Sequence, residues 1–457
     1  MTGGNDDAAV DGVRPLAAAA GRRRRAAPAA GLALAFSVAA ALALAGCGSA
    51  AAPECVRVVS WADYRELEID RAIVDSFQVR HPEIPVCYES LEGSGIYREK
   101  VLTSIAAGTP PGVFLLDGID IPAFVAADAL LDLSPYVDRA GVALDAFEPQ
   151  VLAPFHEGGL WAFPKGYTPM VIYYNKDLFD AAGVPYPEPG WTWSDFLETA
   201  KSLTRDLDGD GAVDQWGFGW PREFFYLQSW IWAGGGELLS PDGTRASGFL
   251  DSPETVAAVR FYLELATRHG VAPRIEMFRR GLGGLSRLFY SGRVAMLQSG
   301  HWSAPRFQRH EDAGRLRWGV APFPVREGAA PATALYASGW AVPKTARHRR
   351  WAVQLAAFLA SETAQRMRSR MGLELPALRA VAGELAAADT TGRERVFLDA
   401  VAAARHPWGT RVEKWREVED VLFDLLDRPL LRGEPVQAVA AELAARIDTL
   451  LAAGAER

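Results

Sequence analysis

Strand-like and helix-like segments alternate along the chain after residue 54. An apolar strand at Val56–Ser60 precedes an amphipathic segment at 67–79, where Ile69, Ile73 and Phe77 recur at helical spacing. The alternation continues with strands at 86–89 and 113–116, a helix at 97–107 and a Gly/Pro-rich break at 108–112. Strands joined through helices pair in parallel, so the sequence predicts an α/β fold with helices on both faces of a sheet.

Later segments keep the same character. A strand is expected at 170–174, Thr192 with Asp195 forms a capping box that opens a helix, and Ser252-Pro253 marks another helix start. The last hundred residues contain Ala-rich amphipathic runs and are expected to be helical.

The first 47 residues have the features of an export signal. Four arginines at 22–25 precede an apolar stretch at 26–45, which ends in Leu44-Ala45-Gly46-Cys47. This ending resembles the lipobox of bacterial lipoproteins, which implies that Cys47 is lipidated and becomes the mature N-terminus. A single transmembrane anchor is the alternative, but the run is short and lacks a positively charged flank after it. We therefore expect residues 1–47 to be a signal peptide, 48–54 a linker, and the product a lipid-anchored protein outside the cytoplasm.

The chain has three cysteines, and lipidation of Cys47 leaves Cys55 and Cys87 as a pair. Both lie at the start of predicted neighbouring strands, so a disulfide between them is geometrically plausible in an oxidising compartment. Two buried free thiols are the alternative.

Size and charge restrict the function further. About 400 residues follow the signal, enough for two or three domains with real cores. The net charge of −8 argues against a nucleic-acid partner.

Carboxylates and aromatic rings follow the first three predicted strands, where ligands bind in open parallel sheets. The first strand leads into Trp61 and Tyr64, the second into Glu92 and the third into Asp117. Carboxylates accept hydrogen bonds from hydroxyl groups, and flat rings cover the C–H faces of a pyranose, so this combination suits polyols.

Further aromatic residues gather between 216 and 232, just before three glycines. Any one of these rings is best explained as core, but so many together favour a binding wall for some of them. Gly300 with Trp302 and Gly339 with Trp340 are further candidates, because glycine lets the backbone approach a ligand.

Seven short stretches together resemble the extracellular solute-binding proteins of carbohydrate ABC importers, a family that includes maltose- and glycerophosphodiester-binding proteins. They occur in family order at 105–114, 132–137, 160–165, 173–179, 191–193, 291–296 and 339–344. The resemblance implies a periplasmic-binding-protein-like α/β fold in which two lobes, joined by a hinge, close on a ligand in the cleft between them. By analogy, lobe 1 holds residues 55–167 and 300–344, and lobe 2 holds 168–299 and 345–457. The residues expected to bind ligand are Trp61 from its strand end, and from the family pattern Tyr64, Glu92, Asp117, Tyr167, Trp220, Trp230, Gly300, Trp302, Gly339, Trp340 and Arg411.

One acidic loop suggests calcium. Asp206, Asp208, Asp210 and Asp214 resemble the start of a calcium-binding loop, but Gly217 stands where a glutamate ligand is expected. A polar turn is the alternative, and no cofactor is otherwise expected.

The resemblance implies a monomeric, non-enzymatic, substrate-binding component of an ABC importer. Its partners would be a sugar-like ligand (a mono- or oligosaccharide, a polyol or a glycerophosphodiester), a permease, its ATPase and the membrane. A secreted carbohydrate-active hydrolase is the main alternative, and it would need two carboxylates across a scissile bond. An adhesin or structural lipoprotein is a third interpretation, but it would not need a cleft of rings and carboxylates.

Overall fold

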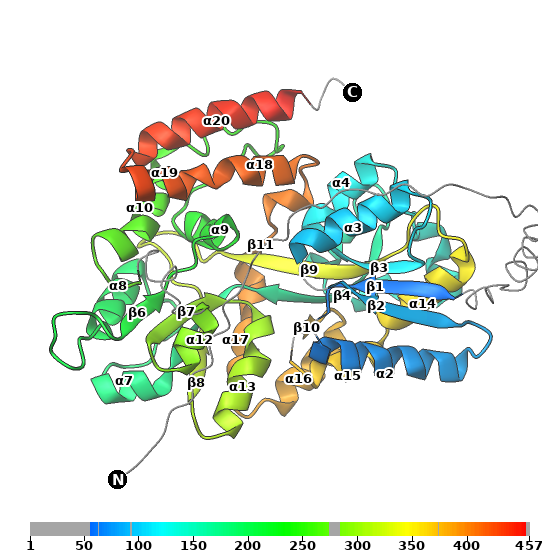
Figure 1. Cartoon of the computed structure of the whole chain (residues 1–457), viewed down its shortest axis with the longest axis horizontal. Helices are drawn as coiled ribbons and strands as arrows, with labels where there is room; N and C mark the ends of the chain where they lie inside the picture. Colours follow the sequence, from blue (N-terminus) through cyan, green and yellow to red (C-terminus); the bar gives the residue numbers. More distant parts are fainter. Residues whose placement is uncertain (1–54, 63, 92–93, 274–283, 373, 454–457) are drawn as a thin grey trace, which may run out of the picture. The chain divides into compact units, whose positions relative to one another are not determined.

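The computed structural model describes residues 55–453 apart from 63, 92–93, 274–283 and 373. The predicted signal peptide, Cys47 and the linker lie outside the described residues. In the described part, two β-sheets carry helices on their faces (Figure 1). This agrees with the α/β class predicted from the alternation of strands and helices.

The first sheet has seven strands and mixed direction. β1 pairs in parallel with β2 and β3, whereas β9 runs antiparallel to both β3 and β4. The order is β10-β4-β9-β3-β1-β2, and β11 pairs with the start of β9. Its strands are β1 (Val56–Ser60), β2 (Val86–Ser90), β3 (Val113–Asp117), β4 (Ala162–Pro169), β9 (Thr333–Ala341), β10 (Leu375–Pro376) and β11 (Ala404–Arg405).

The second sheet has four strands in the order β6-β7-β5-β8. They are β5 (Val171–Asn175), β6 (Trp216–Gly219), β7 (Val294–Ser299) and β8 (Trp318–Ala321). Along β5, Val171 and Tyr173 belong to one apolar cluster, while Ile172 and Tyr174 belong to the other. This is the two-residue period of a strand whose faces are both covered.

Helices of the first sheet follow the predicted βαβ pattern and come from both halves of the chain. Their buried residues join one apolar cluster with β1, β3 and β4. These helices are α2 (Tyr64–Arg80), α3 (Ser94–Ala106), α4 (Ile121–Ala126), α14 (Arg349–Leu359), α15 (Glu362–Ser369) and α16 (Arg379–Ala388).

Helices whose buried residues belong to the second apolar cluster cover the face of the second sheet that carries Ile172 and Tyr174. Two of these helices start at the signals predicted from the sequence. The Thr192 hydroxyl accepts from the Asp195 N–H and the Asp195 carboxylate accepts from the Thr192 N–H, which completes the predicted capping box. Ser252 caps the helix that has Pro253 at its first position. These helices are α7 (Lys176–Ala182), α8 (Trp193–Ser202), α9 (Phe224–Ala233), α10 (Pro253–Thr267), α18 (Trp415–Leu422), α19 (Asp424–Arg432) and α20 (Val436–Ala452).

The predicted lobe boundaries stay a prediction, but two segments pair or pack with a different sheet from the one that these boundaries imply. β8 falls in the segment 300–344 assigned to lobe 1, yet it pairs with β5 in the second sheet. Helices α14 to α16 fall in the segment 345–457 assigned to lobe 2, yet they pack on the first sheet. The apolar face of α14, which includes Ala352, Val353 and Ala356, lies against β3 and β9. The order of the family's sequence motifs predicts the order of helices and strands along the chain. It does not predict which sheet an amphipathic helix covers.

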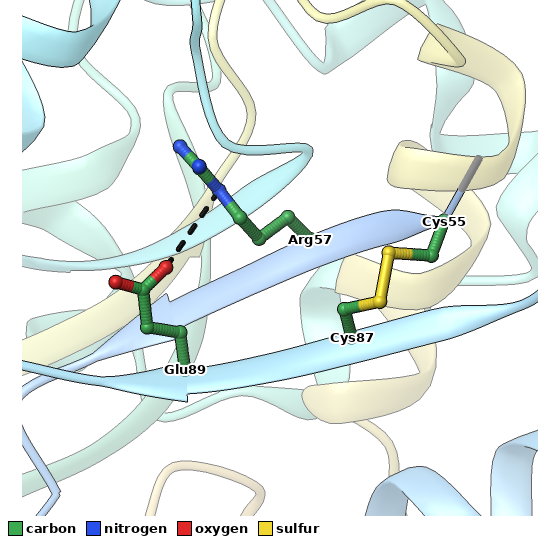
Figure 2. The surroundings of a disulfide bond; sticks show 4 residues. All are labelled: Cys55, Arg57, Cys87 and Glu89. Atoms are coloured by element: carbon green, nitrogen blue, oxygen red, sulfur yellow. Dashed lines mark ion pairs between the residues drawn. A yellow bond between two sulfur atoms is a disulfide. The ribbon is translucent and has the colours of Figure 1, made fainter. Parts of the chain in front are cut away.

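A disulfide joins Cys55 to Cys87 across the first two strands, as the sequence predicts (Figure 2). Their Cα atoms lie 5.8 Å apart, since Val56 stands opposite Val86 in the parallel ladder. Next along the same pair of strands, Arg57 Nε lies 3.9 Å from Glu89 Oε2. Because β2 is the last strand of the sheet, the disulfide ties this edge strand to β1.

No helix among the described residues is long and apolar enough to cross a membrane.

Replacing both cysteines, Cys55→Ser with Cys87→Ser, should lower the free energy of unfolding by about 3 kcal/mol, because the bond closes a loop across 32 positions. Urea unfolding followed by tryptophan fluorescence measures the change. Reductant should destabilise the wild type to the same extent and leave the double variant unchanged. Equal urea midpoints for wild type and variant would contradict a stabilising disulfide.

Candidate ligand-binding site

A pocket of about 330 Å³ lies where β1 and β3 end, beside the middle of β4 and β9. Its wall includes residues of both apolar clusters. Two hollows of about 630 and 430 Å³ lie elsewhere on the first sheet's helices and have fewer aromatic rings. The pocket is lined by Trp61, Glu66, Tyr97, Arg98, Leu116, Asp117, Asp120, Phe124, Tyr167, Thr168, Phe225, Trp302, Tyr336, Ala337, Ser338, Glu374 and Arg416.

One aromatic wall comes from the first sheet. Trp61 follows β1, and its ring meets the ring of Tyr97 edge to face, with 5.2 Å between centroids. The Tyr97 hydroxyl donates to the carbonyls of Val59 and Leu115, at 3.0 and 2.8 Å. These two carbonyls belong to neighbouring strands, so Tyr97 fixes the position of Trp61 relative to the sheet.

A second group of rings in the pocket wall comes from α9, β9 and the turn after β7. The rings of Phe225 and Tyr336 stack with 4.0 Å between centroids, and the ring of Trp302 lies 6.0 Å from that of Phe225. The Tyr336 hydroxyl donates to the Phe225 carbonyl at 2.9 Å. Trp302 is 37% exposed, which leaves part of its ring free to meet a ligand.

Asp117 ends β3 and lies in the pocket wall. Its Oδ1 accepts a hydrogen bond of 3.3 Å from the Ile119 N–H. Burial raises the pKa of Asp117 to about 7, and the nearby charge of Asp120 adds to the rise. The side chain therefore changes its charge near neutral pH, and it can donate or accept a hydrogen bond depending on its proton.

Asp120 is buried and holds both arginines of the pocket wall. Its two oxygens accept from Nε and Nη2 of Arg416, each at 2.9 Å, and Arg98 Nε lies 3.1 Å from Oδ1. Arg416 also pairs with Glu419 at 2.8 Å. A bidentate pair of this kind fixes the guanidinium plane. The two cations are thus already balanced by two carboxylates of the protein, Asp120 and Glu419.

A second charged group involves a lysine of β4. Lys165 is almost wholly buried, and its Nζ lies 3.0 Å from Glu66 Oε1 and also pairs with Glu374. Glu374 Oε2 accepts from the Ser338 hydroxyl at 3.1 Å. Glu66 and Glu374 therefore line the pocket as carboxylates, and both are paired with the same buried ammonium group, that of Lys165.

This combination of groups suits a neutral, hydroxyl-rich molecule. Rings stand on two walls, and the carboxylates Asp117, Glu66 and Glu374 can accept hydrogen bonds from hydroxyl groups. The two arginines that line the pocket have their charge matched by Asp120 and Glu419 together, so an anionic group would have to compete with these carboxylates.

Four of the predicted ligand residues line the pocket, namely Trp61, Asp117, Tyr167 and Trp302. They come from the end of β1, the end of β3, the middle of β4 and the turn after β7. Glu92 and the side chain of Tyr64 lie outside what the structure describes.

Three predicted tryptophans are core residues. Trp220, Trp230 and Trp340 are at most 3% exposed. Trp220 Nε1 donates to the Tyr262 carbonyl, and Trp230 Nε1 donates to Gln298 Oε1. The prediction that their rings meet a ligand is wrong in this conformation, because each packs inside an apolar cluster and the two indole N–H groups of Trp220 and Trp230 have protein partners.

The remaining predicted residues support the site or lie away from it. A Cβ at Gly300 would stand 2.2 Å from the Trp302 ring, so glycine there allows Trp302 its position. A Cβ at Gly339 would lie 3.0 Å from the Phe163 carbonyl oxygen, which reflects the close approach of β4 and β9. Arg411 lies over the ring of Trp408 at 4.2 Å and lines a different hollow.

Sequence reasoning missed several lining residues. Glu66 and Tyr97 stand in the first turns of the helices that follow β1 and β2, so extending the strand-end argument by one helical turn would have found them. Phe225 was in the aromatic cluster but was not singled out. Glu374 and Arg416 had no local signal, because they reach the pocket from distant segments.

The acidic loop brings Asp206, Asp208 and Asp210 together, with carboxylate oxygens within 4.8 Å of one another. These side chains also accept from backbone N–H groups of the loop itself, for example Asp206 from Gly209 at 2.7 Å. Asp214 accepts from the Leu207 N–H. The geometry is that of a polar turn, and calcium binding stays a prediction.

Comparison with known proteins gives a consistent result. The family described as "Bacterial extracellular solute-binding protein" matches residues 61–366. A Brucella abortus protein named as a binding protein is 26% identical over 258 residues, which cover 55% of this chain and 58% of that protein. The match thus spans little more than half of that relative's length.

Two solved structures share the fold. The Listeria monocytogenes ABC substrate-binding protein in complex with cycloalternan has a TM-score of 0.77 and 24% identity, over 87% of this chain and 98% of that one. UgpB from Mycobacterium tuberculosis in complex with glycerophosphocholine has a TM-score of 0.75 and 22% identity, over 89% of this chain and 100% of that one. The two-lobed, periplasmic-binding-protein-like fold expected from the sequence is confirmed.

The raised pKa of Asp117 predicts a pH dependence of stability. Since its folded-state pKa, about 7, lies above the ordinary value of 3.8, the folded protein holds this proton more tightly than the unfolded chain. Stability should therefore fall as pH rises from about 4 to about 7. From pH 8 to pH 5 the wild type should gain about 2 to 3 kcal/mol more than Asp117→Asn, which has no such proton. Urea unfolding at both pH values measures this, and parallel pH profiles would contradict it.

Proposed function

Because this chain belongs to the bacterial extracellular solute-binding protein family, we propose that it captures a sugar-like solute outside the membrane and passes it to an ABC importer. The observation that carries the proposal is the pocket itself. It brings together the aromatic pair Trp61 and Tyr97, the aromatic group Phe225, Tyr336 and Trp302, and several carboxylates in one wall. Such a site matches the alternating apolar and hydroxyl-bearing faces of a carbohydrate.

The charge of the site favours a neutral cargo. Arg98 and Arg416 are paired with Asp120, and the nearby Lys165 is paired with Glu66 and Glu374. A phosphate would gain from an unpaired cation, and each of these three already has a carboxylate partner. A neutral mono- or oligosaccharide or polyol is therefore preferred to a glycerophosphodiester, although a structural neighbour was solved with glycerophosphocholine.

Ligand binding would also explain why the site is divided between two sheets. A solute that contacts Trp61 and Asp117 on one side and Phe225 and Trp302 on the other stabilises whichever arrangement brings both walls together. The closed form is then the signal that a permease can recognise. This role requires binding and release but no chemical change in the cargo, so we propose that the protein is not an enzyme.

Residues 1–54 are assigned by sequence alone. We propose that Cys47 carries the lipid anchor, that residues 48–54 form the tether, and that the mature monomer works at the outer face of the cytoplasmic membrane with a permease and its ATPase.

A thermal-shift screen of the mature chain against sugars, polyols and glycerophosphodiesters tests the proposal. A ligand at a hundred times its dissociation constant should add about 2.7 kcal/mol of stability, seen as a rise of several degrees in melting temperature. The ligand should be recovered intact after incubation. Consumption of the ligand would favour a hydrolase, and a shift with phosphodiesters alone would overturn the neutral-cargo assignment.

A matched pair of variants locates the binding. Trp302→Ala should weaken binding of the hit by about 30-fold, because a stacked ring typically contributes about 2 kcal/mol. Phe423→Ala, at a residue 47% exposed and away from the pocket, should bind like wild type. Equal affinities for the wild type and both variants would show that the ligand binds outside this pocket.

A further inference from the structure

A basic groove runs along α14 on the first sheet's side of the molecule. It consists of two adjoining hollows that share Ala140 and Gln354 in their walls. One hollow is lined by Arg139, Arg349 and Arg350, and the other by Arg80 and His81. The groove is separate from the ligand pocket, and no residue lines both.

Among the residues that the structure describes, no carboxylate forms an ion pair with the arginines of the groove. In the described ranges Arg139 and Arg350 have no carboxylate partner, and Arg349 bonds only to the Lys344 carbonyl, at 2.8 Å. Arg80 lies over the Phe358 ring at 5.4 Å. Glu362, at the far end, already pairs with Arg366. Removal of residues 1–46, with five arginines and three aspartates, leaves a net charge of −10, so this face is basic on an acidic protein.

The groove lies at the end of the sheet where the described chain begins. The Val56 N–H donates to the Pro85 carbonyl at 2.8 Å, and the Ile84 N–H donates to the His81 carbonyl at 3.0 Å. His81 in turn contacts Gln354 of α14 at 3.3 Å. The disulfide holds Cys55 to Cys87, close in sequence to His81 and Ile84 (Figure 2). The point where the tether joins the fold is therefore fixed near the groove.

The tether is short. Cys55 follows Cys47 by eight residues, which reach at most about 28 Å when fully extended. A lipid on Cys47 therefore keeps this end of the sheet close to the membrane, within a few Debye lengths of the headgroups at physiological salt.

We propose that the basic groove docks on the anionic phospholipid headgroups of the membrane that holds the anchor. The proposal rests on the lipid anchoring of Cys47 proposed above, and it does not depend on which solute the pocket binds. Phosphate oxygens accept charge-assisted hydrogen bonds from the guanidinium groups of Arg139, Arg349 and Arg350, which form no ion pair with a carboxylate of the described residues. Glu83 and Asp138 are the acidic side chains nearest in sequence to the groove's cationic residues, and Glu83 is turned toward His81 at 3.4 Å. Docking would give the tethered protein a preferred orientation on the membrane.

Vesicle co-sedimentation of the mature chain carrying Cys47→Ser tests the surface without its lipid. At low salt the protein should bind vesicles of phosphatidylglycerol and phosphatidylcholine, should not bind phosphatidylcholine alone, and should dissociate as salt is added. Arg349→Gln with Arg350→Gln should weaken binding about 25-fold, since each arginine near an anionic surface contributes about fivefold. The pair Arg260→Gln and Arg315→Gln removes the same charge from exposed arginines outside the groove and should change binding less than twofold.

Three results would overturn the proposal: no binding to anionic vesicles, equal binding to neutral ones, or equal losses in the groove and control pairs. The first would leave an acidic protein partner as the occupant of the groove. The thermal shift with the pocket's ligand, measured on the same variants, shows that each is folded. The thermal shift also tests solute binding independently of vesicle binding. A protein that binds no solute could still bind vesicles, so the two proposals can fail separately.

Discussion

The pairing of β4 with β9 is the interaction on which the rest of the structure depends. The two strands are paired from Ala162 opposite Ala341 to Pro169 opposite Leu335, and every residue of both is buried. One residue after β4, the chain enters β5 of the second sheet. Tyr167 and Thr168 of β4 and Tyr336, Ala337 and Ser338 of β9 all line the pocket. The same paired strands therefore connect the two sheets and form the floor of the site, so a ligand held there contacts the connection directly.

Electrostatic pairing sets the character of that site. Asp120 is a single buried carboxylate that holds Arg98 and Arg416, which come from α3 and α18. It thereby ties a helix of the first apolar cluster to a helix of the second, across 296 positions of sequence in the case of Arg416. Because Asp120 and Glu419 together balance the two arginines, the polar groups left for a ligand are mainly acceptors, and the charge of Asp117 changes near neutral pH. The pocket is built for hydroxyl donors more than for anions.

The fold was predictable from the sequence because its signals are local. Strand ends, capping residues and the Cys55–Cys87 pair are set by a few neighbouring residues, and the structure places them as expected. Trp61 and Asp117 were found in the same way, since ligands gather at the ends of parallel strands. Trp220 and Trp230 show the limit of this reasoning. The sequence places them in a ring-rich segment, but only packing decides that they face Tyr262 and Gln298 while Phe225 faces the pocket. Arg416 and the position of α14 depend on long-range contacts that no local pattern encodes.

The central claim is that the pocket between the aromatic walls holds the cargo. A crystal structure of the mature chain with the solute that stabilises it most tests this directly. The account predicts a sugar ring between Trp61 and the Phe225–Trp302 wall, with hydroxyl groups within hydrogen-bond distance of Asp117. A ligand seated in another hollow, with this pocket filled by water alone, would contradict it.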